Sequence, residues 1–92
     1  MIVRILGEGQ YRLDEQAFEA VRAIDDRVQV AADADDDAAF RQALGELLDV
    51  VTGRGRPLPA EELHPSDAIV PGHGTTLAEA RELLSAEGLI PG

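Results

Sequence analysis

Two neighbouring stretches of the chain repeat apolar residues every three or four positions, and a short acidic segment separates them. This spacing places each apolar set on one helix face. The first stretch follows Asp14, and the second begins near Ala38 and stops at Gly53, a residue type that commonly ends helices. We therefore expect an antiparallel pair of helices, with Leu44 and Leu48 buried between them at the centre of the apolar stripe. The apolar positions are Phe18, Val21, Ile24, Val28 and Ala31, followed by Phe40, Leu44, Leu47, Leu48 and Val51.

The segment before the first helix has the pattern of a β-hairpin. Residues 2–6 are rich in Ile, Val and Leu, which predicts a strand at a sheet centre or covered on both faces. Gly7-Glu8-Gly9 predicts a tight turn, and residues 10–13 alternate polar and apolar side chains, as an edge strand does. Asp14 then predicts the N-cap of the first helix, because its carboxylate can accept bonds from free backbone N–H groups.

The second half of the chain predicts shorter elements. Residues 53–59 have the Gly and Pro content of a loop, and residues 60–63 can form one helical turn. Residues 67–70 predict a short or edge strand, because Pro65 and Pro71 bracket them and proline cannot donate to a sheet ladder.

A third helix is expected near the C-terminus. Thr76 and Glu79 have the spacing of a capping box, and Gly88 is placed to end the helix so that Leu89 packs back on Leu84. The predicted order is β-β-α-α-β-α. This is an α+β fold in which a small sheet, made of the N-terminal β-hairpin and a short third strand, packs with an antiparallel helix pair and a C-terminal helix. At this length we expect one domain spanning residues 1–92.

Composition excludes several classes of function. The chain has no Cys, so disulfides, thiolate metal sites and Cys nucleophiles are ruled out. Small secreted domains usually contain disulfides, so their absence favours a cytoplasmic location. A formal net charge of −10, with eight arginines and no lysine, disfavours direct binding to nucleic acid or anionic membranes. Residues 1–6 are too short for an apolar targeting segment, and no run is long enough to insert into a bilayer.

The two histidines form the best candidate for a chemical site. His64 and His73 lie on either side of Asp67, and two imidazoles with a carboxylate could hold zinc or non-haem iron. A small metal-dependent enzyme or metal-binding protein is therefore the alternative function. Ser66 beside His64 and Asp67 also suggests a catalytic triad, but sequence neighbours rarely have triad geometry. Surface loop histidines and a turn role for Ser66 are the simpler interpretations, and we expect no cofactor.

Residues 54–57, Arg-Gly-Arg-Pro, match the core of an AT-hook, which lies in the minor groove of AT-rich DNA. The flanking residues Asp49, Glu61 and Glu62 are acidic, whereas hooks carry further basic residues. A plain loop is one alternative. Another is that the two arginines contact an acidic surface on a protein partner.

Two other motifs have structural explanations. Gly7 and Gly9 lack the third glycine and the following helix start of a dinucleotide site, and a hairpin turn accounts for them. The acidic run from Asp33 to Asp37 lacks the alternating ligands, central Gly and terminal Glu of a calcium loop. Carboxylates at a helix N-terminus are favoured by the helix dipole, which is explanation enough.

Three segments together resemble a known family. The opening MIVRILGEGQY (residues 1–11), the segment SDAIVP (66–71) and the closing EGLIPG (87–92) resemble the small PspA-associated proteins called PspAA. The resemblance covers essentially the whole chain and is most specific at its two ends. It brings no catalytic motif, so no catalytic, cofactor, metal or partner-binding residue is assigned.

The resemblance implies a role in the phage-shock or envelope-stress response. PspA is a coiled-coil protein that protects the cytoplasmic membrane, and PspAA-like proteins are thought to be its partners or regulators. We therefore expect a non-catalytic adaptor or regulator that binds a PspA-like coiled-coil protein. It would be cytoplasmic or peripheral to the membrane through that partner, with a homodimer left open.

Overall fold

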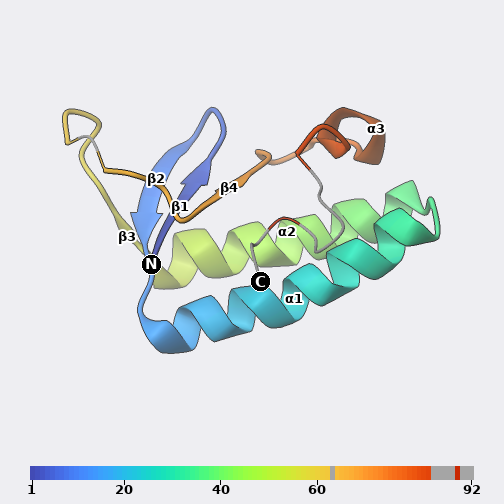
Figure 1. The fold of residues 1–92 in the computed structure, drawn as a ribbon, viewed down its shortest axis with the longest axis horizontal. Helices are drawn as coiled ribbons and strands as arrows, with labels where there is room; N and C mark the ends of the chain where they lie inside the picture. The colour runs from blue at the N-terminus through green and yellow to red at the C-terminus, as the bar shows by residue number, and fades with distance from the viewer. Residues whose placement is uncertain (63, 84–88, 90–92) are drawn as a thin grey trace.

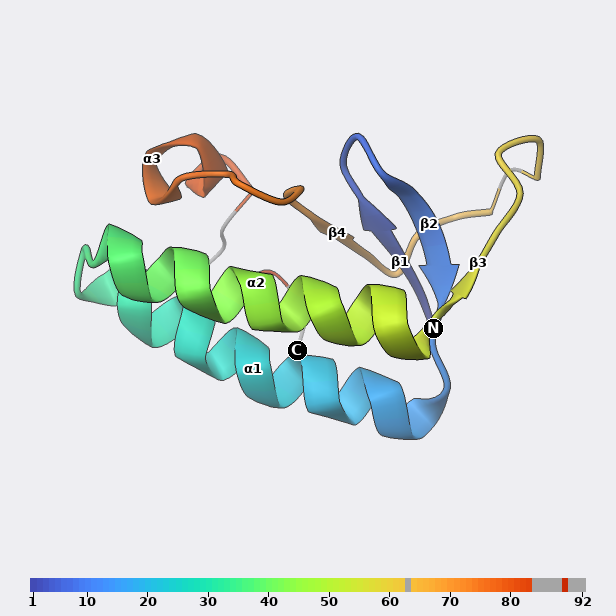
Figure 2. The ribbon, with the colours of Figure 1, turned by 180° about the vertical axis from the view of Figure 1, so that it is seen from behind.

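A computed structural model describes residues 1–62, 64–83 and 89 of the chain. The elements run β1 (Ile2–Ile5), β2 (Gly9–Arg12), α1 (Glu15–Asp33), α2 (Asp37–Arg54), β3 (Arg56–Pro57), β4 (Ala68–Val70) and α3 (Leu77–Ala80). Figure 1 shows α1 and α2 side by side along the long axis, with the sheet and α3 over one face of the pair, and Figure 2 shows the same layers from behind. The predicted α+β fold is confirmed.

Side-chain caps begin both long helices. Asp14 Oδ1 accepts the Ala17 N–H at 2.7 Å at the start of α1, and Asp36 Oδ1 accepts the Ala39 N–H at 3.1 Å at the start of α2. The predicted stop of α2 at Gly53 is wrong. The helix continues to Arg54, and Gly55 caps it by donating its N–H to Val51 O at 2.9 Å.

The difference between these two glycines is steric. A Cβ on Gly53 would meet no atom within 4 Å, so Gly53 is simply a helical residue. A Cβ on Gly55 would lie 2.8 Å from Leu13 Cδ2 and would collide with Val51 O. Only glycine lets the chain leave α2 so close to the end of β2, and this close approach sets the true helix end.

The sheet has four strands in the order β3-β2-β1-β4. β1 pairs antiparallel with β2, with Val3 opposite Tyr11, and parallel with β4, with Arg4 opposite Ile69. The predicted hairpin, the central position of β1 and the short edge strand near residue 69 are therefore confirmed.

The expectation that β2 is an edge strand is wrong. Arg56 and Pro57 were predicted to lie in a loop, but they pair antiparallel with Arg12 and Tyr11 of β2 and form the outer strand β3. The sequence gives little sign of β3, because it is two residues long and contains a proline. Proline is tolerated there because β3 is itself an edge.

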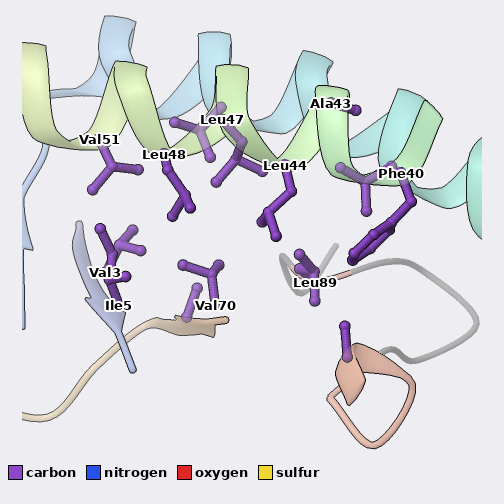
Figure 3. Packing of buried hydrophobic residues seen from close by; sticks show 14 of the residues in the cluster. Val3, Ile5, Phe40, Ala43, Leu44, Leu47, Leu48, Val51, Val70 and Leu89 are labelled. Carbon is purple, nitrogen blue, oxygen red and sulfur yellow. The ribbon is translucent and has the colours of Figure 1, made fainter. Parts of the chain in front are cut away.

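The core lies between the sheet and the helix pair. Figure 3 shows Val3, Ile5 and Val70 pointing from the strands toward Leu48 and Val51 of α2. Leu44 and Leu48 are 2% and 0% exposed, so their predicted burial is confirmed, but Figure 3 shows both extending from α2 toward the side of the sheet rather than toward α1. Burying large aliphatic side chains from both layers is the main stabilising contribution to such a fold.

The C-terminal segment is described only in part. The predicted capping box is present: Thr76 Oγ1 accepts the Glu79 N–H at 3.2 Å, and Glu79 Oε1 accepts the Thr76 N–H at 3.0 Å. Leu89 is 5% exposed and donates its N–H to Asp25 Oδ1 at 2.9 Å. The third helix is shorter than predicted, because α3 ends at Ala80 with Arg81 as its C-cap, and residues 81–83 form a turn. Gly88 and the predicted Leu84–Leu89 contact lie outside the described residues.

Candidate interaction surfaces

The three residues proposed as metal ligands lie in three different contacts. His64 Nε2 is 3.3 Å from Glu62 Oε2, and Asp67 Oδ2 accepts the Ile2 N–H at 2.7 Å. His73 Nδ1 is 2.8 Å from Glu8 Oε1. Within residues 1–62, 64–83 and 89, no group of three or more His, Cys, Asp or Glu side chains could hold a metal ion.

Ser66 has a structural contact rather than a triad contact in the part of the chain that the structure describes. Gln10, 7% exposed, donates its side-chain amide to Ser66 Oγ and to His64 O, both at 2.8 Å. Gln10 therefore ties the segment before β4 to β2. Sequence reasoning missed it, because alternation alone makes residue 10 a polar position of an edge strand.

Glu8 and His73 join two turns that are far apart in sequence. Glu8 Oε2 accepts the His73 backbone N–H at 2.9 Å, in addition to the side-chain contact. The backbone hydrogen bond first, and the imidazole second, hold the pKa of the Glu8 carboxyl below its ordinary value of 4.5. Gly72 is required here, because a Cβ on it would lie 2.8 Å from Leu6 O. This clamp fixes the position of residues 72–75.

The clamped turn forms one wall of a groove of about 470 Å³, and α2 forms the other. Arg41, Gln42 and Gly45 line it from the helix, and His73 and Thr75 line it from the turn. Gly45 lies in the middle of α2, yet a Cβ on it would meet no atom within 4 Å. Glycine inside a helix costs about 0.5–1 kcal/mol relative to alanine, and no contact among the described residues accounts for it.

A second groove, of about 300 Å³, lies where β2 and α2 end and β3 begins. Arg12, Arg54 and Arg56 line it together with Leu13 and Asp14. Arg12 and Arg56 are direct partners in the β2–β3 register, so two like charges face each other across the strands. The sequence drew attention to Arg54 and Arg56 but not to Arg12, whose proximity depends on β3.

The acidic turn between the helices lies at the opposite end of the molecule (Figure 1). Asp35 forms an ion pair with Arg81, and Asp36 caps α2. Asp37 accepts the Leu77 N–H at 2.8 Å, which connects the start of α2 to α3. Asp33 accepts a hydrogen bond from Gln29 at 2.8 Å. These carboxylates all contribute to the structure. The predicted helix N-terminal role is confirmed for Asp36 and Asp37, whereas Asp33 ends α1 and Asp35 lies between the two helices.

Among the described residues, no helix combines the length and the apolar character needed to cross a bilayer. A sequence profile of the family described as "PspA-Associated protein", PspAA, matches residues 1–92. No curated protein and no solved structure matches the chain. Because the match spans the whole chain, the protein belongs to the PspA-associated family.

Proposed function

We propose that this protein is a non-catalytic adaptor or regulator that binds a PspA-like coiled-coil protein of the envelope-stress response. The observation that carries the proposal is the family match over residues 1–92. Residues 1–92 act as one domain. The complex forms in the cytoplasm, and the protein reaches the membrane surface through its partner.

The groove beside α2 supports binding of a helical partner. A partner helix presents ridges of side chains, and a groove that accepts one is a common mode of helix recognition. Gly45 allows the backbone of α2 to be approached closely, which is a usual reason for an otherwise unfavourable glycine. The clamp between Glu8 and His73 holds the opposite wall in place before binding, which lowers the entropy cost of forming the complex.

The proposal is tested by calorimetric titration of the purified protein with the PspA-like protein of the same organism. Concentrations of tens of micromolar are used, with and without anionic lipid vesicles. The proposal expects a saturable heat of binding. If no association is detected in either condition, the adaptor function loses its support.

A matched pair of variants locates the contact. Gly45→Leu fills the groove, and Ala23→Leu adds a similar side chain to an exposed position of α1. We expect Gly45→Leu to weaken partner binding by about tenfold or more, because the added side chain occupies space that the partner helix needs at the centre of the contact. Ala23→Leu should leave affinity unchanged. Equal affinity of the two variants would exclude the groove as the contact.

A further inference from the structure

The three arginines that line the smaller groove, called here the arginine cluster, come from different elements. Arg12 ends β2, Arg54 ends α2, and Arg56 begins β3. Figure 1 shows these ends meeting beside the point marked N. The side chains of Arg12, Arg54 and Arg56 are exposed. Three arginines from three elements thus line one groove.

The backbone that carries the cluster is held in place. Gly55 is packed against Leu13, Tyr11 and Val51, so the chain between Arg54 and Arg56 has little freedom to move. Arg56 and Pro57 pair with β2, and Leu58 donates its N–H to Gln10 O at 2.9 Å. Binding groups on a fixed backbone lose less entropy when a ligand binds.

The charges of the cluster are not balanced within the described part of the chain. Like charges directly opposite each other on paired strands are destabilising, and Arg12 and Arg56 are so placed. The chain has 18 acidic residues, yet no described ion pair includes an arginine of the cluster. The arginines that do form such pairs are Arg27 with Glu46, Arg41 with Asp37, and Arg81 with Asp35.

Two internal explanations do not account for the cluster. The negative end of the α2 dipole favours Arg54 but has no bearing on the pairing of Arg12 with Arg56. Asp14 lines the same groove, but its Oδ1 accepts the Ala17 N–H as the cap of α1. The arrangement is therefore explained best by an anion from another molecule.

We infer that the arginine cluster is the docking site for an acidic segment on a helix of the protein partner. This inference rests on the proposed function and adds a second contact to it. Guanidinium groups bind carboxylates through paired hydrogen bonds, so three of them can hold two or three acidic side chains in a defined orientation.

Extended polyanions fit the site less well. A DNA duplex or an anionic bilayer presents charge over a wide surface, and it would also face Asp14, Glu15 and a protein of net charge −10. The match to an AT-hook fails on geometry, because a hook needs a free extended segment, whereas Arg56 and Pro57 are already paired in the sheet. Among the described residues, Asp14 is the one carboxylate that lines the groove, so a short acidic segment there meets fewer negative charges than an extended polyanion would.

The test compares two triple variants of equal charge. The variant Arg12→Gln/Arg54→Gln/Arg56→Gln removes the cluster, and the variant Arg22→Gln/Arg27→Gln/Arg81→Gln removes three arginines elsewhere. Each changes the formal net charge from −10 to −13. Affinity for the PspA-like protein is measured by calorimetry at about 50 mM and about 500 mM salt, after circular dichroism has verified folding.

We expect the cluster variant to bind about tenfold more weakly at low salt and the control variant to bind as the wild type does. The difference should shrink at high salt, because exposed charges are screened. Equal losses in both variants would assign the effect to overall charge and overturn the inference. A requirement for the cluster in binding phosphatidylglycerol vesicles, with unchanged partner affinity, would identify a membrane as the occupant.

A second measurement separates failure of the site from failure of the proposed function. A helical peptide rich in glutamate is titrated into the isotope-labelled protein, and amide chemical shifts are followed by NMR. We expect shifts at Arg12, Gly55 and Arg56 that the cluster variant abolishes. Shifts without binding to the PspA-like protein would leave the site standing and reject the proposed partner. No shifts would reject the site itself.

Discussion

The two ends of the helix pair carry opposite charges and use them differently. At the turn between α1 and α2, the carboxylates of Asp35, Asp36 and Asp37 contact groups of the same chain: a guanidinium and two backbone N–H groups. At the other end, the arginines of the cluster form no ion pair among the described residues. The role of clustered charged residues therefore cannot be assigned from the sequence alone. Such residues stabilise the structure where other groups of the same chain bond to them, and they are available for binding where no such groups lie nearby.

The ends are also electrically independent. The molecule is 37 Å along its longest axis, and the helices follow that axis (Figure 1). Exposed charges are screened beyond about 8 Å at physiological salt, so the acidic turn does little to neutralise the arginines. The net charge of −10 thus conceals a local positive surface.

The largest effect on stability is expected from a substitution of Gly55, which lies between two arginines of the cluster. Gly55→Ala should cost about 1–3 kcal/mol, because the new Cβ collides with Val51 O and Leu13. Gly53→Ala is the control, and it should stabilise by about 0.5–1 kcal/mol as a helix substitution with open space. Urea unfolding measures both. Similar values for the two would mean that Gly55 does not hold the cluster in place.

At the acidic end, a carboxylate is expected to be structural. Asp36→Ala removes the cap of α2 and should cost about 1 kcal/mol. Asp26→Ala removes an equal charge from an exposed position of α1 and should change stability by less than about 0.5 kcal/mol. The comparison is made from thermal or urea unfolding. An Asp36→Ala protein as stable as the control would remove the distinction between the two ends.

The Glu8–His73 clamp is expected to make a smaller, pH-dependent contribution. The pKa of Glu8 is lowered in the folded protein, so its stabilising effect is present above about pH 4.5 and is lost as the pH falls through the lowered pKa. The wild type should exceed Glu8→Gln in stability by about 1 kcal/mol or less near pH 6. Unfolding at several pH values should show this gap closing in acid. A constant gap would contradict the linkage.

The smallest stability effect is expected from the arginines themselves. Changing Arg54 and Arg56 together to Ala should alter the unfolding free energy by no more than about 0.5 kcal/mol, because both are exposed. The same protein should show no detectable loss of binding to AT-rich duplex at physiological salt, since the wild type is expected to bind none. A large destabilisation would mean that these arginines have structural partners. Micromolar binding of the wild type to the duplex, abolished by the double substitution, would support the interpretation of residues 54–57 as an AT-hook.

Local signals explain which parts of the fold could be read from the sequence. The caps at Asp14 and Thr76, and the apolar stripe around Leu44 and Leu48, act within one or two helical turns, so spacing alone reveals them. Strand β4 was also recognisable from its flanking prolines, Pro65 and Pro71. The end of α2 was not, because the steric demand on Gly55 comes in part from Leu13 and Tyr11, which are remote in sequence.

The candidate surfaces depend still more on distant contacts. The arginine cluster requires the pairing of Arg12 with Arg56, and the groove requires Glu8 to hold His73 beside α2. Neither contact has a sequence pattern of its own, because β3 is two residues long and Glu8 reads as an ordinary turn residue. The sequence could draw attention to Arg54 and His73, but it could not place them.

Hydrogen–deuterium exchange of the free protein and of its complex with the PspA-like protein is the most direct test of where the partner binds. We expect the partner to cover the arginine end and the groove beside α2 and to leave the acidic turn open. Amides of residues 52–58, of β2 and of residues 41–45 should therefore exchange more slowly in the complex, while those of residues 33–36 should be unchanged. Protection confined to residues 33–36, with none at residues 52–58, would contradict this placement of the partner.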